Sequence, residues 1–287
     1  MANDTEILHY LWNGKLAVCF QLDEQEIHGI QNPEPFYLMV PRMSYFPLVC
    51  DKAKKHFVKH VDPEKQEMEM WLEFKNIPLK WNNPIGVLYD LFTSDDKQVD
   101  LPWKITVHFD NFPEDQLLRC SCRESIESNF MSSMKEADML KHRSQVFSTM
   151  QRHQHNQLWT GLLNDKFDQF WSENKKLMEP SEGSYFKHIP VHFYRSRSSV
   201  MTQTLVKPVS DDGNPMTLGE LMKLNYPSVD NRKFVYRIEK FVLILKKYYL
   251  FSAKVFTHGI CIPHETPVQW MSEHMSYLDN FLHLVVI

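Results

Sequence analysis

The side chains with the most potential for chemistry in this chain are a pair of histidines and a pair of cysteines. His153 and His155 lie two residues apart, and residues at i and i+2 of a helix do not face each other. A zinc site would need ligands at i and i+4, or nearby cysteines and carboxylates. Cys120 and Cys122 are too close together for a CxxC redox motif. We therefore expect a solvated loop or helix start at the histidines, a linker at the cysteines, and no metal site.

The sequence also lacks the common catalytic motifs. It contains no G-x-S-x-G nucleophile elbow and no phosphate-binding P-loop, and the whole chain has 8 glycines. Cys19 and Cys50 lie in apolar stretches, where a buried cysteine is the expected state. An enzyme that uses Cys50 or the histidine pair is one alternative, and it predicts a deep pocket around those residues. We expect no catalytic residue and no cofactor.

The composition is that of a globular protein with several domains. The 287 residues are 43% hydrophobic and 13% aromatic, and their net charge is −4, so the chain can bury a sizeable core. A general nucleic-acid-binding protein would have a strong basic excess, so nucleic acid is not an expected partner. The five scattered cysteines imply no disulfide framework. The start MANDTEILHY lacks signal-peptide features, and no apolar run reaches the about 20 residues of a membrane span. We expect a cytoplasmic protein.

The first 112 residues contain several stretches in which apolar and polar residues alternate, the pattern of half-buried strands. Other stretches have helical spacing. The predicted strands are 16–22, 36–40, 68–74 and 103–109, and the predicted helices are 4–12, 44–61 and 84–92. After the short first helix, the order strand, strand, helix, strand, helix, strand predicts an α+β roll of ubiquitin-like type, in which one helix packs across a small mixed sheet.

The middle of the chain is predicted to be helical. Ser121 and Glu124 fit a capping box, and apolar residues then recur at spacings of three and four. A second helical run extends from 158 to 177, and Pro180 ends it. The strand pattern then returns, with strands predicted at 189–193, 200–209 and 282–286 and helices at 217–224 and 266–275. A second strand-helix-strand roll is therefore expected.

Several stretches together carry a resemblance to a known family. They are 79–86 (LKWNNPIG), 101–109 (LPWKITVHF), 130–146 (FMSSMKEADMLKHRSQV), 164–171 (NDKFDQFW), 217–219 (TLG), 270–274 (WMSEH) and 279–283 (DNFLH). In this order and combination they resemble the autophagy protein 5 family. The resemblance implies two ubiquitin-like rolls flanking a helix-rich domain, with limits at 1–14 for an N-terminal helix, 15–112, 113–184 and 185–287.

The resemblance also implies a non-catalytic function in autophagosome formation. A lysine of the family's Met-Lys-Glu-Ala-Asp motif is joined by an isopeptide bond to autophagy protein 12, a ubiquitin-like modifier. The conjugate binds autophagy protein 16 and acts as an E3-like factor. It promotes transfer of autophagy protein 8 family members to phosphatidylethanolamine. The implied partners include the E2-like enzymes of both conjugation systems, and the implied location is peripheral, on preautophagosomal or phagophore membranes.

Lys135 is the matching position in this sequence. It follows Met134 on the flank of a predicted apolar helix face, with Met131 at i−4 and Met139 at i+4. The spacing alone is equally typical of a solvated helix lysine, and Lys141 is a competing acceptor. An amine must lose its proton to attack a thioester, so we expect docking of the E2-like enzyme to lower the pKa of the lysine by desolvation. The alternative function is that of an unconjugated adaptor with two ubiquitin-like domains.

Two further features have open alternatives. The basic stretch with Lys52, Lys54, Lys55 and Lys59 is either a solvated helix face or a contact for anionic lipids. The N-terminal helix with Trp12 is a candidate wall of the groove for autophagy protein 16.

The segment near 232–253 is atypical for the family. Residues 234–251 (FVYRIEKFVLILKKYYLF) lack every common turn residue. They are either a real insertion or a translated intron, and transcript sequencing across codons 228–258 distinguishes the two.

Overall fold

The computed structural model describes residues 4–93, 101–120, 122–180, 185–195, 201–210, 212–225 and 253–287. Two sequence predictions fall outside these residues, namely the Ser121 cap and the atypical segment 232–253 apart from residue 253. Within the described part of the chain, no helix is both long and apolar enough to cross a membrane.

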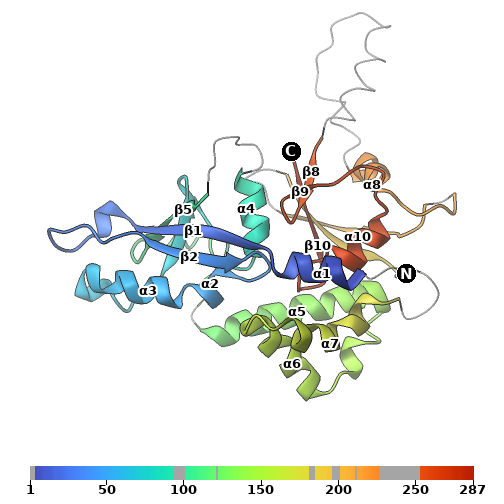
Figure 1. The fold of residues 1–287 in the computed structure, drawn as a ribbon, viewed down its shortest axis with the longest axis horizontal. Coiled ribbons are helices and arrows are strands. Elements are labelled where there is room, and N and C mark those ends of the chain that lie inside the picture. The colour runs from blue at the N-terminus through green and yellow to red at the C-terminus, as the bar shows by residue number, and fades with distance from the viewer. Residues whose placement is uncertain are drawn as a thin grey trace, which may run out of the picture.

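The first roll is a five-stranded sheet with helices against it (Figure 1). Its elements are β1 (Lys15–Leu22), β2 (Phe36–Pro41), α2 (Phe46–Val49), α3 (Asp51–Phe57), β3 (Trp71–Phe74), β4 (Ile77–Pro78), α4 (Ile85–Thr93) and β5 (Trp103–His108). The strand order is β2-β1-β5-β3-β4, with β1 and β5 parallel and the other pairs antiparallel. The buried face of β1 consists of its apolar alternate residues, as the sequence predicts.

Two predicted elements of this roll are wrong in extent. The helix predicted over 44–61 is interrupted at Cys50, whose ψ of 0° separates α2 from α3, and it ends in a 3-10 turn at Val58–His60. The strand predicted from residue 68 begins at Trp71, because the Met68 N–H donates to the Lys65 carbonyl in a turn. The spacing of apolar residues continues without change through Cys50 and through residues 68–70, so it does not reveal where the helix is interrupted or where the strand begins.

The middle of the chain folds into three helices, α5 (Arg123–His142), α6 (Arg152–Leu163) and α7 (Phe167–Met178). The run predicted over 158–177 is therefore two helices rather than one. Asp165 takes a left-handed φ of 53° between them, and the Lys166 N–H donates to the Gly161 carbonyl. The chain then reverses, so that α6 packs against α7.

The contact between α6 and α7 depends on the absence of a side chain at Gly161. A Cβ built there would lie 2.7 Å from the Phe170 backbone nitrogen. We expect Gly161→Ala to destabilise the protein by about 1–3 kcal/mol through overpacking, although alanine is the better helix former. Thermal unfolding of the full chain measures this, with Gln157→Ala, exposed on the same helix, as the control. A Gly161→Ala protein that melts at or above the wild-type temperature would contradict the close approach.

The second roll repeats the strand order of the first. Its elements are β6 (Ile189–Tyr194), β7 (Thr202–Val206), α8 (Leu218–Asn225), β8 (Val255–Thr257), β9 (Ile260–Cys261), α10 (Val268–His274) and β10 (Leu282–Val286). The sheet order is β7-β6-β10-β8-β9, and β6 and β10 form the parallel pair. The predicted hairpin of β6 and β7 is confirmed, with Ile189 opposite Val206.

The N-terminal helix α1 (Asp4–Trp12) lies where the two rolls and the helical domain meet (Figure 1). Its Leu11 and Trp12 belong to a core built mainly by the helical domain and the second roll, to which Met43, Tyr45 and Val87 of the first roll also contribute. The first roll has a second core of its own. The fold is thus α+β, with two ubiquitin-like rolls flanking a helical domain.

Candidate functional site

Lys135 lies on the exposed side of α5. The opposite side of this helix is buried, and it includes Ile126, Phe130 and Met134. The predicted apolar face is therefore confirmed, and Lys135 is placed on its flank. Among the residues that the structure describes, none forms an ion pair or a hydrogen bond with the Lys135 ammonium group. The amine is accessible to an incoming protein.

The surroundings of Lys135 combine apolar and polar surface. Met139, one turn further on, is 51% exposed, and Met131, one turn earlier, is half-buried. The adjacent Glu136 accepts a hydrogen bond of 2.7 Å from the Gln203 amide of β7. Lys135 is thus held at a fixed place beside the second roll, between two flexible apolar side chains that can adapt to a partner surface.

Lys141, the competing acceptor in the sequence, is buried. It is 2% exposed, its Nζ lies 3.2 Å from the Met178 sulfur, and it sits 4.8 Å from the centroid of the Phe186 ring. Burial lowers the pKa of Lys141 to about 7. This shift favours the neutral form of the Lys141 amine, which is the nucleophilic form. A thioester carried by another protein cannot reach the amine, however, because the side chain is buried.

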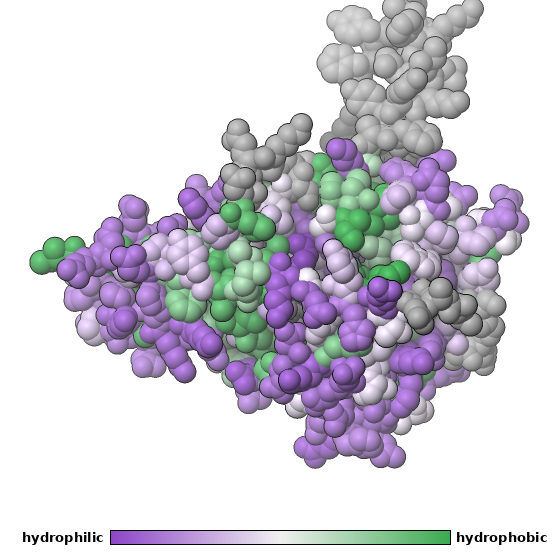
Figure 2. All heavy atoms as spheres, in the orientation of Figure 1, coloured by the Kyte–Doolittle hydropathy of each residue, from purple (hydrophilic) through white to green (hydrophobic). Residues whose placement is uncertain are grey.

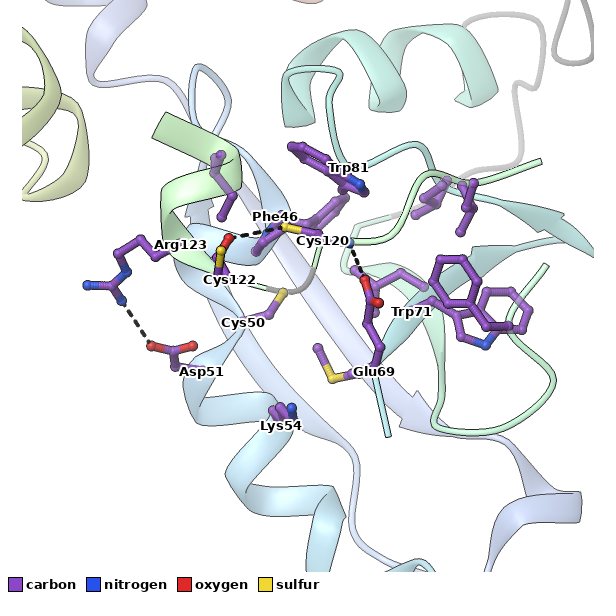
Figure 3. A pocket seen from close by; sticks show the side chains of 17 residues that line it. Phe46, Cys50, Asp51, Lys54, Glu69, Trp71, Trp81, Cys120, Cys122 and Arg123 are labelled. Atoms are coloured by element: carbon purple, nitrogen blue, oxygen red, sulfur yellow. Dashed lines mark hydrogen bonds and ion pairs between the residues drawn. The ribbon is translucent and has the colours of Figure 1, made fainter. Parts of the chain in front are cut away.

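A cavity of about 220 Å³ lies beside Cys50, between α2, β3 and the linker into α5 (Figure 3). The enzyme alternative predicted a pocket there. The Cys50 thiol is fully buried, however, and burial raises its pKa far above the ordinary range. A thiolate nucleophile needs the opposite shift. Around the cavity, Glu69 accepts a hydrogen bond from the Cys120 N–H, and Arg123 pairs with Asp51 at 3.4 Å. These contacts attach the linker to the first roll.

The two histidines are not brought together by the structure. His155 stacks on Phe147, with ring centroids 4.5 Å apart, whereas His153 is exposed in the first turn of α6. No group of three or more His, Cys, Asp or Glu residues in the described ranges is placed to hold a metal ion.

The basic residues of α3 and the following turn face outward. Lys52, Lys55 and Lys59 are exposed, while Ala53 and Phe57 bury the other side of the helix. This arrangement is compatible with both a solvated face and a lipid contact.

An apolar groove of about 750 Å³ runs between α1 and the second roll. Its lining is Glu6, Ile7, Tyr10, Leu11, Ile260, Ile262, Pro263, Thr266, Trp270 and Met275. Hydrophobic surface is visible beside α1 over the region of β9 (Figure 2). Tyr10 is 77% exposed and Ile260 is 42% exposed. A patch of this kind, with a few polar groups at its edge, is typical of a protein interaction site.

Trp12 does not line this groove. Its ring packs on Phe167 and Phe170, with both centroids 5.5 Å away, and it is buried. Trp12 therefore attaches α1 to the helical domain, and the other side of the helix forms the groove. The groove lies beside α1, the helix that the sequence offers as a candidate, but Tyr10 and Ile260 line it and were not among the residues predicted.

Comparison with known proteins gives matches along almost the whole chain. Three family models match in order: "Autophagy protein ATG5, UblA domain" at residues 11–109, the "alpha-helical bundle region" at 123–180 and the "UblB domain" at 188–286. Autophagy protein 5 of Drosophila melanogaster is 46% identical over 288 residues, which is 100% of this chain and 98% of that protein. The chain belongs to the autophagy protein 5 family. It therefore has a role in autophagy.

Other members of the family agree with this assignment. Autophagy-related protein 5 of Caenorhabditis elegans is 33% identical and is matched over 98% of its length. The crystal structure of Kluyveromyces marxianus Atg5 has a TM-score of 0.77 and 18% identity, and the match covers 98% of this chain and 99% of that one. At this identity the likeness concerns the fold alone.

The UblA and UblB domains of this family member meet at a buried ion pair of the first roll, whose carboxylate also accepts a hydrogen bond from the second roll. The Arg42 guanidinium, after β2, donates to Asp90 of α4 at 2.5 Å, and Asp90 also accepts the Gly259 N–H of the second roll at 2.7 Å. Asp90 is 2% exposed. His258 stacks on Tyr277 next to this contact. One carboxylate thus receives donors from both rolls, which fixes their relative position.

Proposed function

We propose that this chain is a non-catalytic acceptor and scaffold for autophagosome formation. Lys135 forms an isopeptide bond with the C-terminal glycine of autophagy protein 12. The resulting conjugate, with autophagy protein 16, acts as an E3-like factor for lipidation of autophagy protein 8 family members on phosphatidylethanolamine.

The observation that supports the proposal most is the contrast between two lysines of α5. Lys135, in the family's motif, is exposed and makes no ion pair with any described residue, whereas Lys141 is enclosed by Met178 and Phe186. Among the lysines of α5, only Lys135 offers its amine to a thioester on an E2-like enzyme.

The groove beside α1 is the proposed site for autophagy protein 16. A coiled-coil protein offers helices with apolar stripes, and a helix in an apolar groove is a common recognition mode. In this arrangement an apolar stripe of autophagy protein 16 contacts Tyr10 and Ile260, which line the groove.

We expect Ile260→Glu to weaken binding of autophagy protein 16 at least 100-fold, because it places an uncompensated carboxylate in an apolar contact. Calorimetry with the purified partner measures the affinity. Ile30→Glu makes the same change at a fully exposed site on the first roll, and it should bind as the wild type does. Undiminished binding of the Ile260→Glu protein would place autophagy protein 16 elsewhere.

The proposed domain limits are 1–14, 15–112, 113–184 and 185–287. We also propose that the E2-like enzymes of both conjugation systems are partners. The proposed location of this protein is the cytoplasm, with peripheral attachment to preautophagosomal or phagophore membranes.

The alternative function is that of an unconjugated adaptor. The mass of the protein from cells on a denaturing, reducing gel separates the two, because only the acceptor gives a heavier covalent band.

A further inference from the structure

A second concave site lies at the junction of the helical domain and the second roll, on residues that the proposed conjugation does not use. Its volume is about 450 Å³. The lining is Lys141, His142, Arg143, Gln145, Tyr185, Phe186, Lys187, His188, Lys207, Pro208 and Val209. More than half of these residues are basic, and no acidic residue of the described ranges is among them. We call this site the basic pocket.

Backbone hydrogen bonds build the walls of the basic pocket. The Lys187 N–H donates to the Lys141 carbonyl at 3.0 Å, and the His188 N–H donates to the Leu140 carbonyl at 3.1 Å. The end of α5 is thereby attached to the strand that becomes β6. Since Ile189 pairs with Val206, the antiparallel register places Lys207 opposite His188.

Arg143 is held at the pocket by an unusual backbone conformation. It ends α5 with a left-handed φ of 56°, and Ser144 after it has a φ of 63°. Glycine is the usual residue at such a helix end, and two consecutive non-glycine residues in this region are uncommon. The strained backbone thus occurs at a residue whose side chain lines the pocket. Strained backbone conformations of this kind cluster at functional sites.

The positive charges of the pocket lie close enough together to affect the protonation of His188. Burial lowers the pKa of His188, and the nearby charges of Lys187, Lys207 and Arg143 lower it further. The negative end of the α5 dipole accounts for basic residues in the last turn of that helix. It does not account for Lys187 and Lys207, which come from the second roll. Like charges gathered from separate elements into a concave site produce a positive potential that attracts anions.

We propose that the basic pocket binds a small phosphorylated polyanion of the inositol phosphate class. Arginine and lysine are the usual donors to phosphate oxygens, with arginine able to bind two at once. Three exposed cations, Arg143 at the end of α5 and Lys187 and Lys207 next to the two strands of one hairpin, suit a ligand that carries several phosphates around a compact ring. The apolar side chains of Phe186, Pro208 and Val209 form the remaining wall, against which such a ring can lie. The ligand is either free in solution or the headgroup of a phosphoinositide.

The test is calorimetric titration of the full chain with inositol hexakisphosphate as the probe. We expect one site per chain in the wild type and at least tenfold weaker binding when Lys187→Gln and Lys207→Gln are combined. Both lysines are exposed, so the fold should persist, and unchanged thermal unfolding without ligand checks this. The matched control combines Lys104→Gln on β5 and Lys175→Gln on α7, two exposed lysines outside the basic pocket, which removes the same charge.

The control variant decides between a site and general attraction. Loss of binding in the pocket variant alone supports the proposal. An equal loss in both variants, or several equivalent sites per chain, means that only net charge matters and overturns it. Attraction of that general kind also falls steeply with salt.

Vesicles separate the two sources of the ligand. Vesicles containing phosphatidylinositol bisphosphate are compared with phosphatidylserine vesicles of equal charge. A preference for the first that the free probe abolishes supports a lipid headgroup, and binding of the free probe without such a preference supports a free ligand. Vesicle binding that depends on charge alone and is unchanged in the pocket variant, together with no binding of the free probe, overturns the proposal.

Discussion

Substitution of Lys135 by arginine is expected to abolish the heavier covalent form of the protein completely. Arginine keeps the positive charge and most of the stem on α5, so the exposed position should tolerate it. Its guanidinium group stays protonated in proteins and does not act as an amine nucleophile. The measurement is a denaturing, reducing gel of the tagged protein from cells, in which we expect the wild type to run largely as the conjugate.

The control for this experiment is Lys175→Arg, an exposed lysine of the neighbouring helix α7, which should leave the heavier band intact. A band that persists in the Lys135→Arg protein would move the attachment to another lysine. A wild type that runs only at the mass of the bare chain would instead support the adaptor.

Removal of the Asp90 carboxylate is expected to cause the largest loss of stability. In Asp90→Ala the Arg42 charge remains buried without its partner, and the Gly259 N–H loses its acceptor. Breaking a buried ion pair in this way costs about 3–5 kcal/mol. For a chain of this size, this corresponds to a decrease in melting temperature of about 10 °C. Thermal unfolding followed by circular dichroism measures it.

Two variants test the reason for that loss. Asp51→Ala removes the partner of Arg123 from an exposed pair, and exposed pairs contribute little, so its melting temperature should stay close to that of the wild type. Combining Arg42→Met with Asp90→Leu should recover part of the stability, because no charge is then left buried. If Asp90→Ala melts like Asp51→Ala, the buried Asp90 carboxylate contributes little to stability through Arg42 or Gly259.

The strands were predictable because each has one buried face, so that side chains alternate along it. The sequence of β1 carries this signal directly, and so does that of β6. The breaks were not predictable from apolar spacing. Cys50 is buried and apolar, so the helical pattern continues through the point where α2 ends. Asp165 is a residue common in turns, but the apolar residues on both sides of it have helical spacing.

Only its motif singles out Lys135 as the proposed acceptor, since its spacing is that of any solvated lysine. The groove could not be found in this way, because it brings Tyr10 together with Ile260. The basic pocket is similar, since Lys187 and Lys207 look like ordinary surface lysines until the β6–β7 hairpin turns both toward the end of α5. Burial of Lys141 also depends on Met178 and Phe186, which are distant in sequence.

The position of α1 determines the order in which the molecule is completed during translation. Tyr10 leaves the ribosome early, but its neighbours in the groove belong to β9 and α10. At about 5–20 residues per second, the roughly 250 residues between Tyr10 and Ile260 take on the order of 10–50 s to synthesise. During that interval the groove-lining side of α1 is exposed to solvent, because the residues that complete the groove have not been synthesised. Exposed apolar surface of this kind is a target for chaperones. Trp12 of α1 can pack on Phe167 and Phe170 earlier, but the groove itself is completed among the last events in the biogenesis of the protein.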